Sequence, residues 1–297
     1  KLMKHWERHA DAIGLGVLKD SYSVGAKRYV DKDSKHLMEV VKRVPVTTGA
    51  RLNDILQEWA IRHVQTKLGN YFNNARVLFF SGITNFKLAA SLLEYTQNLQ
   101  FADPVRQLGV PKLLDSLDAL ELYANGAHYV TGWTSPTVMS STPVKDWTHF
   151  VLRRAMQKAT VIVADVHDLD EFSIEELAGK TIITSTVNDE RLAQFRDKGV
   201  HMVIDGAPYL FNHVLAPNLL DAMILAASGK PAQDLLEDDY LEIITDLALE
   251  PRILYPNGFK RTNRFAFVIH PLSQEYFKKV KPIELLSQVS PPVFMDS

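Results

Sequence analysis

Asp165 and His167 lie two positions apart and can act as an acid/base pair on a bound substrate. Carboxylates and imidazoles are common proton-transfer groups in enzymes. Because side chains alternate along a strand, the two would point to opposite faces, so the pair requires that the chain has turned by this point. No third His or acid follows at a recognisable ligand spacing, and we expect no metal site.

A glycine turn and a later carboxylate form a second candidate group. Ser81-Gly82 follows an apolar run, and Asp103 stands 21 positions after Gly82. In dinucleotide-binding units, the turn contacts the phosphates, and an acid about 20 residues further on binds the ribose hydroxyls. The spacing therefore predicts NAD or NADP as cofactor, with NAD preferred because a carboxylate repels a 2′-phosphate. The alternative is an ordinary strand–glycine–helix unit, because two of the three fingerprint glycines are missing.

Small and polar residues end two further apolar runs, and we add Ser185, Thr186 and Gly206 to the predicted cofactor site. Ligands of open parallel sheets lie beyond the carboxyl ends of the strands, so these positions belong to one edge. Near the start of the chain, Gly14-Leu-Gly16 lacks the third fingerprint glycine. We expect these glycines to serve backbone packing rather than phosphate contact.

Short apolar runs, separated by helical segments, must position these residues. The runs are 77–80, 161–164, 181–184 and 202–204. Continuous apolar runs indicate strands buried on both faces, so these four should be parallel neighbours in one sheet covered by helices. Ser173 and Glu176 have the spacing of a capping box, and Asn188 can cap the next helix. We predict an α/β fold with a doubly wound, mostly parallel, Rossmann-like sheet, preceded by a small α/β subdomain.

We expect three parts along the chain: an N-terminal α/β subdomain (1–72), a Rossmann-like domain (73–258) and a C-terminal extension (259–297) that opens a further domain. Residues 50–68 carry a regular apolar stripe and predict a helix. We also expect a loop through 18–29, a helix over 112–126 and a strand at 128–130. The stretch 131–143 lacks periodicity and predicts a long loop, either a lid or a solvated connection.

The composition excludes several classes of protein. Hydrophobic residues make up 46% of the 297 residues and charged residues 23%, with a net charge of −2, so nucleic-acid binding is disfavoured. There are no cysteines, which excludes disulfides and thiolate chemistry. No apolar run approaches a membrane span of about 18 residues, and no signal peptide is recognisable, so we expect a cytoplasmic protein. Lys1 stands where an initiator Met would, which indicates a piece of a longer protein.

Two blocks resemble the quinate/shikimate 5-dehydrogenase-like family of predicted oxidoreductases, over residues 11–252. The first block is Ala12-Ile-Gly-Leu-Gly16 through Lys27-Arg-Tyr29 to Pro45-Val-Thr-Thr-Gly49, with Leu52. The second includes Ala164-Asp165, 177–187, Pro208, Asn218, Asp221-Ala222, Asp239-Tyr240 and Pro251-Arg252. Separately, Phe265–Leu272 is similar to the start of long-chain acyl-carrier-protein reductases.

The resemblance implies a Rossmann-type fold and NAD(P)-linked chemistry on a hydroxy acid or an acyl-derived carbonyl. Shikimate dehydrogenases use a lysine shortly after an Asn-Val-Thr-x-Pro motif, whereas 46–51 has neither the proline nor the lysine. No catalytic residue is therefore carried over. We expect an NAD(P)-dependent oxidoreductase, or its nucleotide-binding part, acting on a small-molecule substrate. The alternative is a non-catalytic Rossmann-like domain that binds a ligand or partner. A homo-oligomer, or a further domain contacting the C-terminal tail, stays open.

Overall fold

The computed structural model describes residues 2–16, 21–30, 32–131, 142–210, 213–229 and 234–258. Residues 1–258 form one compact unit, and 259–297 fall outside it. The loop expected over 131–143 is wrong at its two ends, because Thr131 and Thr142-Pro143 are helical. Its middle, 132–141, and the strand expected around Phe265 lie outside the described residues. The predicted domain boundaries at 72 and 258 stay predictions.

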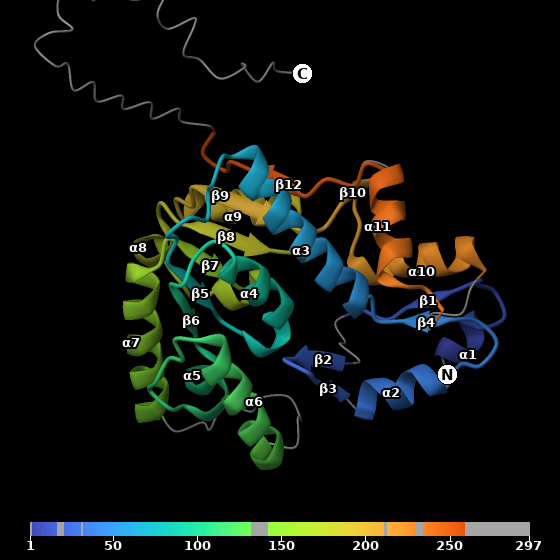
Figure 1. Cartoon of the computed structure of the whole chain (residues 1–297), viewed down its shortest axis with the longest axis horizontal. Helices are drawn as coiled ribbons and strands as arrows, with labels where there is room; N and C mark the ends of the chain where they lie inside the picture. Colours follow the sequence, from blue (N-terminus) through green and yellow to red (C-terminus); the bar gives the residue numbers. More distant parts are fainter. Residues whose placement is uncertain are drawn as a thin grey trace, which may run out of the picture. The chain divides into compact units, whose positions relative to one another are not determined.

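A six-stranded sheet organises this unit (Figure 1). Its strands are β5 (Val77–Phe79), β6 (Leu99–Phe101), β7 (Val161–Val163), β8 (Thr181–Thr184), β9 (Met202–Asp205) and β12 (Arg252–Leu254). The spatial order is β12-β9-β8-β7-β5-β6, and β12 is the antiparallel member. The four strands predicted to be parallel neighbours are confirmed as such. The fold is thus α/β with a mostly parallel sheet.

Eleven α-helices and two short 3-10 helices are described. They are α1 (Leu2–Trp6), α2 (Lys32–Glu39), α3 (Ala50–Lys67), η1 (Ile83–Asn85), α4 (Phe86–Leu93), α5 (Asp103–Leu108), α6 (Leu117–Thr131), α7 (Thr142–Lys158), η2 (Val166–Leu169), α8 (Ile174–Leu177), α9 (Asp189–Asp197), α10 (Pro217–Ser228) and α11 (Glu237–Asp246). The predicted helix 50–68 is confirmed as α3, with its apolar stripe buried. The capping box of Ser173 and Glu176 and the Asn188 cap are also confirmed.

The two faces of the sheet carry separate cores, because side chains alternate along each strand. Val77 and Phe79 of β5 face a cluster that includes α3, α4 and α6. Leu78 and Phe80 face a second cluster, built with α7, α8 and α9. A third core joins α3 to α10 and α11. Helices therefore cover both faces, as continuous apolar strands require.

Short strands complete the described elements. They are β1 (Ile13–Gly14) with β4 (Val46–Thr47), β2 (Ser21–Val24) with β3 (Lys27–Val30), and β10 (Tyr209–Leu210) with β11 (His213–Val214). The loop expected through 18–29 is wrong for residues 21–29, because residues 21–30 form the antiparallel β2–β3 hairpin. The hairpin is held by a buried Val24 and by Lys27 and Tyr29, which both donate to Asn125 of α6.

The strand expected at 128–130 is also wrong, because α6 continues through Thr131. The helix was predicted five residues too early at its start. Leu114 instead exchanges backbone hydrogen bonds with Phe101 and so extends the edge of β6. Helical geometry then begins at Leu117, which places Leu120 and Ala124 in the core.

Candidate functional site

The strand register gathers five predicted site residues in one row. Neighbouring strands pair at Phe101, Phe79, Val163, Ile183 and Ile204. Two residues further along each strand stand Asp103, Ser81, Asp165, Ser185 and Gly206. The row follows the carboxyl ends of the strands. The strand order reverses between β5 and β7, because β5 is followed on one side by β6 and on the other by β7. We call the carboxyl ends of β5 and β7 the switch point.

The Asp103 side chain is buried and binds backbone N–H groups of the turn after β5. Its carboxylate accepts hydrogen bonds from the N–H of Gly82 at 2.8 Å and of Ile83 at 3.1 Å. The residue has no exposed surface, and burial raises the pKa of Asp103 to about 6 although these N–H groups partly oppose the rise. The carboxylate thus occupies the N–H groups that were predicted to bind phosphate. A ribose contact with Asp103 would require both hydrogen bonds to open.

Gly82 is needed for packing at the end of β5. A Cβ atom on Gly82 would meet the Phe101 ring, and would approach Leu120 to 2.9 Å and the Asp103 carboxylate to 3.1 Å. The backbone of Gly82 is right-handed (φ −71°), so the restriction comes from space rather than from conformation. We expected Gly82 to let a phosphate come close to the backbone. In the structure it is the Phe101 ring that lies close to Gly82.

A second internal carboxylate closes the turn after β8. Asp205 has no exposed surface, and it accepts from the N–H of Thr186 and of Val187, each at 2.8 Å. It also accepts from the N–H of Ala207 at 2.9 Å. Arg252 of β12 pairs with the same carboxylate and donates to the carbonyl of Val187. In the turn that follows the predicted Ser185, the N–H groups of Thr186 and Val187 are therefore satisfied from within the chain.

The predicted acid/base pair, Asp165 and His167, lies after β7 and at the start of η2, so the two residues do not alternate along a strand. Asp165 is exposed and precedes η2, whose Asp168 N–H donates to the Asp165 carbonyl. His167 is also exposed, and its Nδ1 lies 3.7 Å from Asp170 and accepts from Arg191 at 2.9 Å. The partners of His167 are thus Asp170 and Arg191. The Arg191 guanidinium holds the pKa of the Asp170 carboxyl below its usual value.

A bidentate ion pair bridges the loops on either side of β5. Arg106 of α5 donates to both carboxylate oxygens of Asp168 in η2, at 2.8 and 2.6 Å. The guanidinium carbon lies 5.3 Å from the centre of the Phe80 ring, at the end of β5. The pair is partly open, with 32% of the Arg106 side chain and 25% of the Asp168 side chain exposed. Sequence reasoning missed both residues, because 62 positions separate them and neither belongs to a motif.

A buried polar network joins the N-terminal segment to α10 and α11. Thr47 donates to Asp221, and Tyr240 donates to the same carboxylate at 2.8 Å. Burial and the Asp221 carboxylate raise the pKa of Tyr240. All three residues belong to the blocks that resemble the dehydrogenase-like family, although they lie far apart in sequence.

Glycines allow this junction to close. A Cβ on Gly14 would lie 2.5 Å from the carbonyl oxygen of Asn218. Gly49 has a left-handed backbone (φ 70°), and a side chain there would meet the backbone of Asn218. The expectation that Gly14 serves packing is confirmed. The glycines of the N-terminal segment let it approach the first turn of α10.

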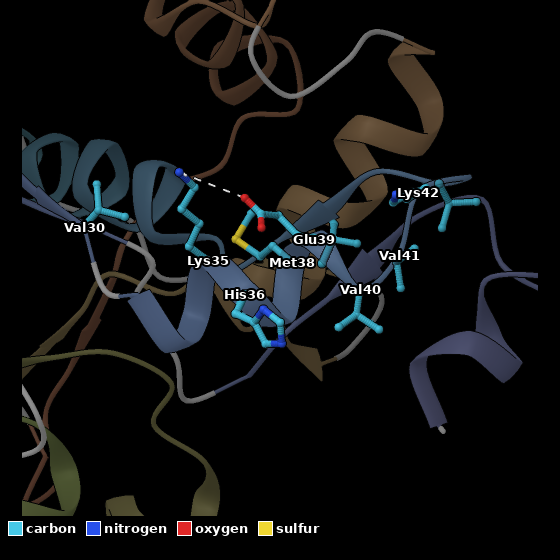
Figure 2. Close-up of a pocket in the computed structure, with 10 residues that line it drawn as sticks. Val30, Lys35, His36, Met38, Glu39, Val40, Val41 and Lys42 are labelled. Atoms are coloured by element: carbon cyan, nitrogen blue, oxygen red, sulfur yellow. Dashed lines mark ion pairs between the residues drawn. The ribbon is translucent and has the colours of Figure 1, made fainter.

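A hollow of about 900 Å³ lies in the N-terminal segment, lined by residues between Val30 and Val46. Figure 2 shows ten of these side chains, with Lys35 and Glu39 of α2 joined as an ion pair at 4.0 Å. None of the predicted site residues lines this hollow, so it is separate from the row at the carboxyl ends of the strands.

Within the described ranges, no three His, Asp or Glu side chains gather as metal ligands. No helix among the described residues is long and apolar enough to cross a membrane.

Comparison with protein families gave two adjacent matches. Residues 1–48 match the family described as Domain of unknown function (DUF8753). Residues 51–256, more than half of the 297 residues, match Domain of unknown function (DUF8754). Comparison with curated proteins and with solved structures gave no match. The junction between the two matched regions falls next to Thr47 and Gly49, whose contacts with α10 tie the two regions together. On the match over residues 51–256, the chain belongs to the DUF8754 family.

Proposed function

We propose that this chain is a Rossmann-like domain that binds a small molecule at the switch point and does not perform nucleotide-dependent redox chemistry. In open parallel sheets, ligands lie beyond the carboxyl ends of the strands where the strand order reverses. Here that place lies between β5 and β7. Ser81 and Asp165 stand at equal positions after those strands, and we assign both to the ligand site.

The observation that carries the proposal is the pair of internal carboxylates. A dinucleotide needs free backbone N–H groups at a glycine turn, where they bind the phosphates. Asp103 already takes the N–H groups of Gly82 and Ile83. Asp205 takes those of Thr186 and Val187. A phosphate at either turn would have to displace a hydrogen-bonded carboxylate. This disfavours a dinucleotide that binds through its phosphates.

Binding measurements test this proposal. Thermal unfolding in the presence of NAD, NADH, NADP, NADPH, ATP and ADP should show no stabilisation of the wild-type protein at millimolar concentration. In a screen of small polar molecules by NMR, the amide signals of Ser81 and Asp165 should move. The Asp165→Ala variant should weaken the hits, whereas Asp197→Ala, an exposed position in α9, serves as the matched control. A dinucleotide that stabilises by about 2.7 kcal/mol at 100 times its dissociation constant would overturn the proposal.

The second candidate is an NAD(P)-dependent oxidoreductase of the quinate/shikimate 5-dehydrogenase-like kind. It is supported by the parallel sheet with its reversal at β5 and by the spacing of Gly82 and Asp103. This function requires Asp103 to leave Gly82 and Ile83 and to face a ribose. In that case Asp103→Ala should weaken NAD binding by about 1.5–3 kcal/mol, as expected for hydrogen bonds to a charged group. Calorimetric titration of the wild type and the variant with NAD separates the two candidates.

A further inference from the structure

We infer that Arg106 anchors a carboxylate group of the ligand, and that Asp168 is a built-in competitor that holds the same guanidinium. The inference rests on the proposed function and names the chemical class of its ligand: a small molecule that carries a carboxylate. The pair crosses the carboxyl end of β5, so it lies beside the switch point rather than at a distant surface.

The geometry of the pair matches carboxylate recognition. The planar guanidinium donates two parallel N–H bonds, at 2.8 and 2.6 Å, to the two oxygens of Asp168. An arginine fork binds any carboxylate in this way, and a ligand carboxylate has the same shape and charge as that of Asp168. The exchange of one carboxylate for another therefore leaves the guanidinium with an equivalent partner.

Arg106 has a second support that does not depend on Asp168. Its guanidinium lies over the Phe80 ring at 5.3 Å, and Phe80 is itself buried and packed edge-on against Phe172 at 5.7 Å. A cation held over an aromatic face is attracted by the negative face of the ring. Arg106 should therefore keep its position when Asp168 moves away. A preorganised fork of this kind loses little conformational entropy when a ligand binds.

Asp168 differs from the two buried carboxylates in how it is held. Asp103 and Asp205 have no exposed surface and accept several backbone N–H bonds each. Asp168 is partly exposed and lies in η2, a four-residue 3-10 helix. Solvent, and hence a dissolved anion, can reach the Arg106–Asp168 pair. A short 3-10 turn also holds few backbone hydrogen bonds that would resist a small movement.

The neighbouring Arg191–Asp170 pair provides an internal comparison. Arg191 belongs to α9 and also binds His167 and Gln194, so its guanidinium is shared among three side chains. It lacks the Phe80 support and lies after β8 rather than beside β5. Removal of Asp170 takes the aspartate partner from Arg191, just as removal of Asp168 takes it from Arg106. It should nevertheless not create the same carboxylate site.

The test uses acetate as probe and the full chain as protein. Amide signals around Phe80 and Arg106 are followed by NMR during titration of the wild type, Asp168→Asn and Asp170→Asn. If Asp168 occupies the fork in nine molecules of ten, its removal should lower the apparent dissociation constant for acetate about tenfold, because only the free fraction binds. Asp170→Asn should behave as the wild type. Equal acetate affinity in the wild type and Asp168→Asn would overturn the inference.

Further variants separate anchoring from structural effects. In the Asp168→Asn background, Arg106→Lys keeps the charge but not the fork, and Arg106→Gln removes both. Acetate binding should fall at least fivefold with lysine and be lost with glutamine. Asp168→Ser is the second variant if asparagine lowers the thermal unfolding temperature. Inorganic phosphate is the second probe: if it binds Asp168→Asn at least tenfold more tightly than acetate, the carboxylate class is wrong. A dinucleotide that binds the wild type would overturn the proposed function by a separate readout.

Discussion

Gly82 donates its backbone N–H to the carboxylate of Asp103 at 2.8 Å, across 21 residues of chain. The same spacing defines the glycine and the acid of a dinucleotide-binding unit, in which both residues contact the ligand. In this protein the two residues contact each other. This hydrogen bond joins the end of β6 to the turn after β5. It explains why a glycine and an aspartate stand at these positions even if no nucleotide binds.

Gly82→Ala should lower the free energy of unfolding by about 1–3 kcal/mol, as expected for overpacking. The added methyl group would press on the Phe101 ring and on the Asp103 carboxylate. Gly126→Ala is the matched control. Position 126 lies within α6, and a Cβ there meets no atom within 4 Å. Urea unfolding of the control should show unchanged or slightly higher stability. Similar values for the two variants would refute the packing role of Gly82.

Asp103 should give the protein a stability that falls as the pH rises from about 4 to 6. Burial raises the pKa of Asp103 to about 6 in the folded protein from its usual 3.8, so the folded state binds the proton more tightly than the unfolded state. The contribution is complete below pH 4 and is lost as the buried group ionises. A shift of about two pKa units corresponds to roughly 3 kcal/mol.

Urea unfolding at pH 4, 5, 6 and 7 measures this contribution. Asp103→Asn lacks the titration, so the free energy of unfolding of the wild type minus that of the variant should fall with pH over this range. The subtraction removes the effect of the other carboxyl groups. A difference that stays constant between pH 4 and 7 would show that Asp103 titrates normally.

Arg252→Ala should destabilise the protein by roughly 2–4 kcal/mol. Removal of the arginine leaves the Asp205 carboxylate buried with hydrogen-bond donors but no opposite charge, and unpaired buried charges are strongly unfavourable. Arg252→Lys should have an intermediate free energy of unfolding, since it restores the charge but not the guanidinium Nη2 that donates to both Asp205 and the Val187 carbonyl. Arg196→Ala is the control, because Arg196 pairs with Asp197 at an exposed surface. In chemical denaturation, that control should lose less than about 1 kcal/mol of its free energy of unfolding.

Thr47→Val and Tyr240→Phe should each cost about 1.5–3 kcal/mol, because each removes a donor to the buried Asp221 carboxylate. The two losses should not add, because the donors share one acceptor. A double-mutant cycle in guanidinium measures the coupling, with the exposed Tyr209→Phe as control. Limited proteolysis should also cleave residues 1–48 faster in both variants. Strict additivity would argue against a shared network.

The sequence predicted those features that depend on local pattern. The apolar runs of the central strands, the stripe of α3 and the caps at Ser173 and Asn188 each lie within one element, and all are present. The errors lie where distant contacts decide the structure. Residues 21–30 form a hairpin because Val24 is buried in a core that α4 and α6 contribute. The local sequence pattern does not predict this contact.

The candidate site was predictable in position but not in detail. Strand ends gave the row that includes Ser81 and Asp165, because register follows from parallel pairing. The direction of the Asp103 carboxylate could not be read from its spacing, since at this spacing it can accept hydrogen bonds either from ribose hydroxyls or from backbone N–H groups. The Arg106–Asp168 pair depends on two loops that meet over Phe80, which only the fold brings together.

The hydrogen bond between Thr47 and Asp221 closes a loop of 174 residues. Contacts of such long sequence separation form late in folding, because the entropy of loop closure precedes the gain from the contact. The parallel strands β7, β8 and β9 are joined by crossovers of 17 residues each (164–180 and 185–201), so they can assemble before the N-terminal segment docks on α10. Refolding of this protein should therefore be slow in its last phase. The chain would then spend that phase with the partners of Gly14 and Gly49 exposed, a state to which chaperones and proteases have access.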